Sequence, residues 1–214
     1  PARTPLVAGS SPARGASPPS FCPPERDRQS VTALAPAPRA REARPVMDAD
    51  AAARPAGYTL RLSKEDFKFA AAHFTLFPDG SGELLHGHNF RVRVELEGPQ
   101  PNEMGLLVDV ATVKERIRSA CDALDEHTLI PEHSSLLELE STEGSVEVRF
   151  GERAYRLPAA DVTLLPITNV TIETLAHLLW GEIAPVLRGS SIALLRVEVE
   201  ETAGQSCAYA AVLP

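Results

Sequence analysis

The chain has 214 residues, of which 43% are hydrophobic and 23% charged, a composition that is normal for a soluble globular protein. It contains no apolar run of about 18 residues or more, so we expect no membrane-spanning helix and no membrane partner. The net charge of -8 argues against nucleic acid as a partner, because phosphate binding requires a basic surface.

The first segment of the chain differs in composition from the rest. Residues 1–46 hold seven Arg, three acidic residues and 10 of the 19 prolines, without helical or strand periodicity. We therefore predict a disordered Pro/Arg-rich extension over residues 1–50 and one folded domain over residues 57–214. A transit peptide is the alternative for such an Arg-rich segment, although so much proline disfavours the amphipathic helix that this signal needs.

Alternating residues predict two strands at the start of the domain. Apolar residues alternate from Phe67 to His73, and a turn is expected at residues 78–82. From His86 to Glu97 the even positions are His or apolar, whereas most odd positions are polar or charged. This period of two predicts a strand with one face turned toward a core.

Helical spacing begins after Asp109, whose side chain suits an N-cap. Apolar residues then recur every three or four positions as far as Leu124, which predicts an amphipathic helix. A second helix with a similar stripe is expected to begin near Thr171 and to bend or end at Pro185.

Three further strand regions complete the prediction. A hairpin is expected at residues 146–157, and the last two strands at residues 192–201 and 207–213. The order is strand, strand, helix, helix, strand, strand, with the hairpin inserted before the second helix. This order is typical of an α+β fold, with an antiparallel sheet and two helices on one of its faces.

The chain has three widely spaced cysteines, Cys22, Cys121 and Cys207, which do not form a disulfide framework. A reducing cytoplasm is therefore the expected location. Cys121 falls on the apolar stripe of the first predicted helix, which favours a place in the core over a reactive role.

Three histidines share the inward face of the first two predicted strands. His86 and His88 are two positions apart, which on a strand puts both side chains on the same side. His73 lies on the inward face of the preceding strand, so a hairpin would bring three imidazoles together. Three histidines with an open fourth position are typical of catalytic zinc. The alternative is three hydrogen-bonded core histidines.

Three other residues are candidates for chemistry. Glu201 continues the apolar face of a predicted strand, so its carboxylate must be paired or must serve a ligand. It could bind a ring with a guanidine-like edge, or it could be an ion-pair partner or the solvated end of the strand. Asp125 and His127 follow the first helix and could form a proton relay, although the acids here could equally be a solvated helix end.

The segments around these residues resemble the 6-pyruvoyl-tetrahydropterin synthase / 6-carboxytetrahydropterin synthase family. The resemblance covers about residues 58–213, and the set is far more specific than any one piece. The matching segments are Phe69-Ala-Ala-Ala-His73, His86-Gly-His-Asn-Phe90, Gly105-Leu-Leu-Val-Asp109, Asn169-Val-Thr-Ile-Glu173, and Glu201-Thr202 followed by Tyr209.

The resemblance implies the tunnelling fold, in which the sheets of several subunits join into a barrel. It implies a homo-oligomer, a trimer or a hexamer, with the site between subunits. The substrate would be 7,8-dihydroneopterin triphosphate or a close relative, with Zn²⁺ acting on its side-chain hydroxyls as a Lewis acid. The implied residue roles are metal ligation by His73, His86 and His88, pterin binding by Glu201 and Thr171, and catalysis by Asp125 and His127.

Two departures from the family pattern matter. The common members have a catalytic Cys shortly before the paired histidines, and none stands in residues 79–85 here. Glu83 stands three residues before His86, which resembles a subgroup in which Glu replaces that Cys and the product is 6-hydroxymethyl-7,8-dihydropterin. Glu83 would then be catalytic, unless it is a solvated loop carboxylate. In Leu124-Asp-Glu-His-Thr-Leu129, His127 also stands one place later than the family's histidine.

The favoured prediction is a zinc-dependent lyase that cleaves the side chain of dihydroneopterin triphosphate. A 6-carboxytetrahydropterin synthase of the deazaguanine (queuosine) pathway is the alternative, but it would need a thiol from elsewhere in the chain. A non-catalytic zinc- or pterin-binding relative, or a zinc hydrolase acting on another purine-like ring, remains open. The insertion at about residues 138–166 could lengthen the barrel or cover the site.

Overall fold

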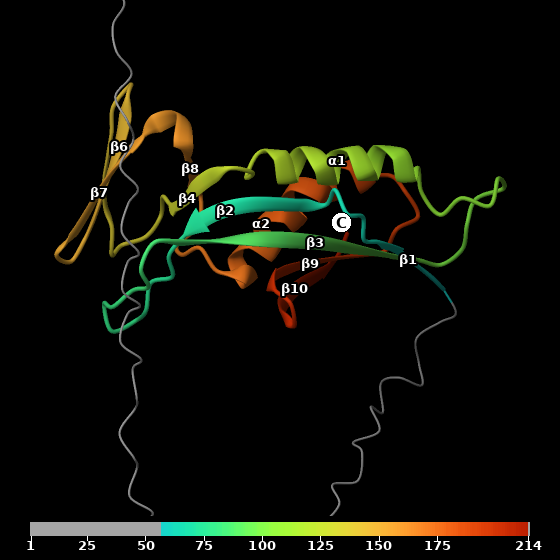
Figure 1. Ribbon diagram of the computed structural model, residues 1–214. Helices are drawn as coiled ribbons and strands as arrows, with labels where there is room; N and C mark the ends of the chain where they lie inside the picture. Colours follow the sequence, from blue (N-terminus) through green and yellow to red (C-terminus); the bar gives the residue numbers. More distant parts are fainter. Residues whose placement is uncertain (1–56, 214) are drawn as a thin grey trace, which may run out of the picture. The chain divides into compact units, whose positions relative to one another are not determined.

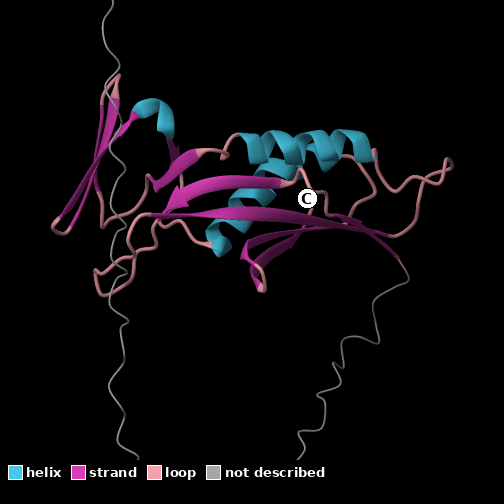
Figure 2. Ribbon diagram, in the orientation of Figure 1, coloured by secondary structure: helices cyan, strands magenta, loops and turns pink. Residues whose placement is uncertain are grey.

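The computed structural model describes residues 57–213, which contain two sheets and two α-helices (Figures 1 and 2). The predicted extension over residues 1–50, with Cys22, lies outside the described residues. No helix within the described range is long and apolar enough to cross a membrane.

The larger sheet has seven strands. Six of them lie in the order β10-β9-β3-β2-β4-β8, and the seventh, β1, pairs with β3 on the same edge as β2. Five of its strands are joined to one another by antiparallel pairing: β1 (Tyr58–Leu62), β2 (Lys68–His73), β3 (His86–Gly98), β9 (Leu194–Thr202) and β10 (Gln205–Val212). Two short strands extend it in parallel from β2: β4 (His127–Pro131) and β8 (Val162–Leu165).

The α+β class is confirmed, and so are the two early strands, the two helices and the closing strand pair. The sheet is mixed, however, and not wholly antiparallel as predicted, because β4 and β8 join it in parallel. Neither strand alternates: the last three residues of β4 are all buried, and β8 has only four residues. Such short runs carry no period that could distinguish a strand from a loop.

Both helices, α1 (Val110–Asp122) and α2 (Ile172–Ile183), cover the same face of the sheet (Figure 1). The Asp109 carboxylate caps α1 by accepting the Ala111 N–H at 2.9 Å. Thr171 caps α2 in a reciprocal capping box with Thr174. A short 3₁₀ turn, η3 (Ala184–Leu187), follows α2 where Pro185 interrupts the helical hydrogen bonds.

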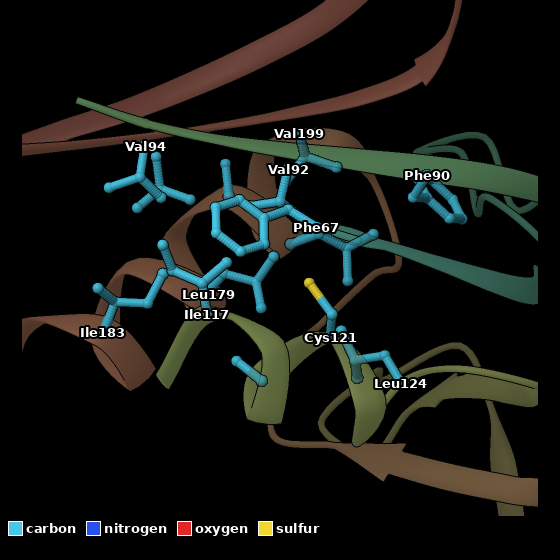
Figure 3. Packing of buried hydrophobic residues seen from close by; sticks show 14 of the residues in the cluster. Phe67, Phe90, Val92, Val94, Ile117, Cys121, Leu124, Leu179, Ile183 and Val199 are labelled. Carbon is cyan, nitrogen blue, oxygen red and sulfur yellow. The ribbon is translucent and has the colours of Figure 1, made fainter. Parts of the chain in front are cut away.

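The main core lies between the helices and the inward face of the sheet (Figure 3). It combines the apolar stripe of each helix with alternate residues of β2, β3 and β9, such as Phe90, Val92 and Val199. Cys121 is fully buried in this core, and burial raises the pKa of its thiol to about 12. The expectation of a core cysteine at this position is confirmed.

The inserted sheet consists of three antiparallel strands, β5 (Glu138–Ser141), β6 (Ser145–Phe150) and β7 (Arg153–Pro158). The predicted hairpin corresponds to β6 and β7, and a single 3₁₀ turn, η2 (Ala159–Asp161), leads from β7 to β8. One side of this sheet forms a second apolar cluster with the segment that follows β2 and with β4. Its buried members are Phe74, Leu76, Ile130, Val146, Val148 and Phe150.

Candidate metal centre and substrate pocket

The register of β2 against β3 brings three histidines together. His73 pairs with His86, and Ala71 pairs with His88, so all three imidazoles emerge on the inward face at one end of the strand pair. Their nearest ligand nitrogens lie within 4.8 Å of one another. The hairpin predicted from alternation therefore forms, and it creates the expected three-histidine cluster.

Backbone carbonyls orient two of these rings. The Val170 carbonyl lies 3.3 Å from Nδ1 of His73, and the Leu84 carbonyl lies 2.8 Å from Nδ1 of His86. Because a carbonyl can only accept a hydrogen bond, each Nδ1 is the donor, and in the neutral ring Nε2 is then the nitrogen free to bind a metal. Metal-bound histidines in proteins are oriented in the same way.

His73 shows that the cluster suits a metal ion. Its side chain is 1% exposed, yet its Nε2 has no hydrogen-bond partner within residues 57–213. Burial lowers the pKa of His73 despite opposing contributions from Val170 and Glu201, so the ring stays neutral, as metal ligation requires. A buried nitrogen with a free lone pair, beside two further imidazoles, is the donor set of a three-histidine zinc site.

Glu201, at the end of β9, lies beside the cluster. Its Oε1 is 3.2 Å from Nε2 of His73, outside hydrogen-bonding geometry, and 3.6 Å from Nε2 of His88. Its Oε2 accepts a hydrogen bond of 2.8 Å from the Gln205 side chain. Only 13% of the Glu201 side chain is exposed, so it is not a solvated strand end, and its charged neighbours within residues 57–213 are the histidines His73 and His88.

A pocket of about 490 Å³ opens onto the cluster. Its volume is within the range of roughly 300–1,000 Å³ that is usual for small-molecule sites. Residues from four separate segments line it, and they include every predicted site residue except His73, Asp125 and His127. The lining consists of Thr75, Glu83, His86, His88, Thr171, Ile172, Glu173, Glu201 and Gln205.

Glu83 lies in the segment between β2 and β3 and faces this pocket. Burial raises its pKa, but hydrogen bonds from Thr75, together with the nearby His86 and His73, hold the pKa below the ordinary value. One of these bonds joins the Thr75 N–H to Oε2 of Glu83 at 3.0 Å. An ionised carboxylate in a fixed position can accept a proton from a bound substrate.

Asp125 and His127 are not brought to this pocket within one chain. Oδ1 of Asp125 accepts the Ala70 N–H at 2.6 Å, and Nδ1 of His127 lies 2.5 Å from the Asp125 carbonyl. Glu126 between them adopts a left-handed conformation with φ 58° and donates its N–H to the Ala70 carbonyl. His127 lines a different pocket of about 450 Å³, which His88 also borders.

Two contributors to the site were not predicted. Gln205 holds Glu201 from the opposite strand, across a turn at Gly204, where φ is 88°. The turn residues Ala203-Gly204 could have indicated that pairing. Thr75 acts through its backbone N–H, which no sequence pattern reveals.

Comparisons with known proteins agree with this geometry. The family described as 6-pyruvoyl tetrahydropterin synthase matches residues 61–211. A Methanocaldococcus jannaschii protein, provisionally named 6-carboxy-5,6,7,8-tetrahydropterin synthase, is 29% identical over 145 residues, which is 66% of this chain and 88% of that protein.

Solved structures also resemble the chain. The crystal structure of 6-pyruvoyl tetrahydropterin synthase from Plasmodium vivax is 28% identical, with a TM-score of 0.67, and covers 73% of this chain and 99% of its own. A second P. vivax structure, 27% identical with the same TM-score and coverage, is described as a catalytic-residue mutant in which Glu is replaced by Cys.

Proposed function

This chain belongs to the 6-pyruvoyl tetrahydropterin synthase family and is a lyase of pterin biosynthesis, and we propose that it cleaves the side chain of 7,8-dihydroneopterin triphosphate in a zinc-dependent reaction. The proposed product is 6-hydroxymethyl-7,8-dihydropterin. The observation that carries the proposal is Glu83, whose ionised carboxylate lines the same pocket as His86, His88 and Glu201.

His73, His86 and His88 would hold the zinc, which when bound supplies Lewis-acid polarisation of the side-chain hydroxyls. Glu83 would take the proton from the second hydroxyl of the side chain. The bond between the first and second side-chain carbons then breaks, its electron pair passes toward the pterin ring, and the second carbon becomes an aldehyde. Return of the proton to the first carbon gives the hydroxymethyl product, so the step needs no oxidant.

Glu201 and Thr171 would bind the pterin ring. A pterin presents two adjacent N–H donors that match the two oxygens of a carboxylate. Gln205 already orients the Glu201 carboxylate through a hydrogen bond to Oε2. Thr171 caps α2 and also lines the pocket, so its position is fixed by the helix.

The absence of a thiol from the pocket favours side-chain cleavage. Within residues 57–213 no cysteine lines it: Cys121 is buried in the core with its pKa raised to about 12, and Cys207 lies on β10. The P. vivax relative has a glutamate that is described as catalytic, which supports a carboxylate in this role. The name of the M. jannaschii relative favours the alternative, 6-carboxytetrahydropterin synthesis.

We also propose that the protein assembles as a trimer or hexamer in a reducing cytoplasm. In the described part of the chain, β1 pairs only with β3 and β10 only with β9, so each offers an open edge. Tyr58 and Val212 on these edges are 56% and 72% exposed. Pairing of such edges between copies would extend the sheet and would let Asp125 and His127 of one copy approach the pocket of the next.

Product identification by mass spectrometry tests the proposal. Full-length, zinc-loaded protein is incubated with 7,8-dihydroneopterin triphosphate. A 6-hydroxymethyl-7,8-dihydropterin product is expected. A 6-carboxy product would instead establish the alternative activity, and recovery of intact substrate with zinc bound would indicate a non-catalytic binding protein.

A further inference from the structure

The segment that carries Glu83, residues 74–85, forms a short arm between β2 and β3. The arm is hydrogen-bonded to itself: the Phe77 N–H donates to the Ser81 carbonyl at 2.8 Å, and the Glu83 N–H donates to the Thr75 carbonyl at 2.9 Å. These bonds fix the shape of the arm. Its position relative to the histidines must come from contacts outside it.

Two neighbours provide these contacts. The Asn169 side chain accepts the Leu76 N–H at 3.0 Å and donates to the Leu76 carbonyl at 2.8 Å. On the inserted sheet, Nη1 of Arg153 donates to the backbone carbonyl of Glu83 at 2.6 Å. Asn169 therefore holds the arm near its start, at Leu76, whereas Arg153 holds it at Glu83 itself.

The inserted sheet also packs directly on the arm. A Cβ atom at Gly82 would lie 2.7 Å from Cε1 of Phe150, so only a glycine lets the arm approach this closely without displacing the ring. Phe150 is 7% exposed and stacks with Phe74 at a ring-centroid distance of 6.5 Å. The Arg153 guanidinium lies 5.9 Å from the Phe150 ring centroid, a cation–π contact that restrains the arginine.

We propose that Arg153 is a positioning residue for Glu83 and that the inserted sheet, residues 138–158, serves as a brace for the arm. Arg153 fixes the main chain at Glu83, so that the carboxylate keeps its bond to the Thr75 N–H and faces the pocket. None of residues 138–158 lines the pocket, so within the described chain the insertion acts on the site through the arm. The inference rests on the proposed role of Glu83 as the base.

Kinetics of three variants test this role. Arg153→Ala removes the donor to Glu83, Arg153→Lys keeps a charged donor, and Arg149→Ala removes an exposed arginine of the same sheet that pairs only weakly with Glu147, at 3.5 Å. We expect Arg153→Ala to lower kcat about 10-fold or more, because small displacements of a catalytic group are costly. KM and bound zinc should be nearly unchanged, since the three histidines and Glu201 lie on β2, β3 and β9, outside the arm. Arg153→Lys should recover most of the loss.

Two kinetic outcomes would overturn the positioning role. One is an equal loss of kcat in Arg149→Ala, which would mean that the sheet matters only for general stability. The other is a kcat that stays at the wild-type value in Arg153→Ala.

Amide hydrogen exchange provides a readout that does not depend on turnover. In Arg153→Ala, exchange over residues 74–85 should be about 10-fold faster, with no change in α1 or α2, because the arm opens locally. Unchanged exchange in the arm would refute the brace. If the wild-type protein does not convert the pterin, the proposed function fails, whereas the brace is still decided by the exchange of the arm.

Discussion

The inward face of β2 and β3 has two ends with the same backbone geometry and different chemistry. At one end Phe69 pairs with Phe90, and the rings stack at a centroid distance of 4.8 Å. At the other end His73 pairs with His86, and these rings also lie 4.8 Å apart. The three-histidine cluster therefore continues the core face, with imidazoles in place of phenyl rings, and needs no separate scaffold.

The two ends differ in solvent access. His73 is as deeply buried as the phenylalanines, whereas His86 and His88 are partly exposed where the pocket opens. Phe90 connects the ends, because its ring packs edge-on against His73 and His88 at 5.5 and 5.7 Å. The cluster thus has one apolar side that fixes the imidazoles and one open side that faces the pocket, an arrangement that a catalytic metal site would require.

Of all the variants, Glu83→Gln should have the largest effect. It should lower turnover at the open, histidine end and leave the packing of the apolar end unchanged. Loss of the proton acceptor should lower kcat by about 10²–10⁴-fold, the usual contribution of a general base. Zinc content and the free energy of unfolding should stay near the wild-type values. Steady-state kinetics with metal analysis provide the measurement, and the exposed Glu103→Gln serves as the matched control. Unchanged turnover would remove Glu83 from the mechanism.

Phe90→Ala should disturb both ends at once. The ring is fully buried, so its removal should lower the free energy of unfolding by about 3–5 kcal/mol. It should also weaken zinc binding, because His73 and His88 lose a common packing partner. Urea unfolding and zinc titration measure the two effects, and Phe90→Leu should show a smaller loss in each. A variant with weakened stability but unaltered zinc affinity would show that the two ends are independent.

Gly82→Ala should have a smaller effect, confined to the arm that carries Glu83. The added methyl group meets the buried Phe150 ring, and such overpacking costs about 1–3 kcal/mol. Thermal unfolding should detect this loss. Gly144→Ala, where a Cβ meets nothing within 4 Å, is the control. Equal stability of both variants would mean that the arm moves away from the inserted sheet without cost.

The smallest effect is a change in the free energy of unfolding that depends on ionisation of Cys121 and appears only at alkaline pH. Its thiol loses a proton near pH 9.0 in the unfolded chain and near 12 in the folded protein. The unfolded state therefore binds fewer protons between these values, and stability should fall as the pH rises above 9. The difference in unfolding free energy between wild type and Cys121→Ala, measured from pH 7 to pH 10, should shrink over this range. A constant difference would contradict the burial of the thiol.

Alternation along single strands made the three-histidine cluster predictable. The spacing of His86 and His88, together with the inward position of His73, was sufficient because a two-residue period fixes which face a side chain occupies. The helices were predictable in the same way, because apolar residues that recur every three or four positions fix which face of a helix is buried.

The remaining features depend on contacts between distant parts of the chain. Asp125 is occupied by the Ala70 N–H, 55 residues away, and Arg153 reaches Glu83 across 70 residues. The parallel strands β4 and β8 are too short to carry a period. Local patterns cannot reveal such pairings, which is why the sequence alone did not show the Ala70 bond to Asp125 or the contact of the insertion with Glu83.

Zinc content per chain tests the central claim most directly, and it requires no substrate. The wild-type protein should bind one zinc per chain, and His86→Ala and His88→Ala should lose it while keeping the far-UV circular dichroism of the wild type. His133→Ala, which removes an exposed histidine outside the cluster, should retain the metal. A wild-type protein that binds no zinc, or a His88→Ala variant that binds it fully, would contradict the three-histidine metal centre.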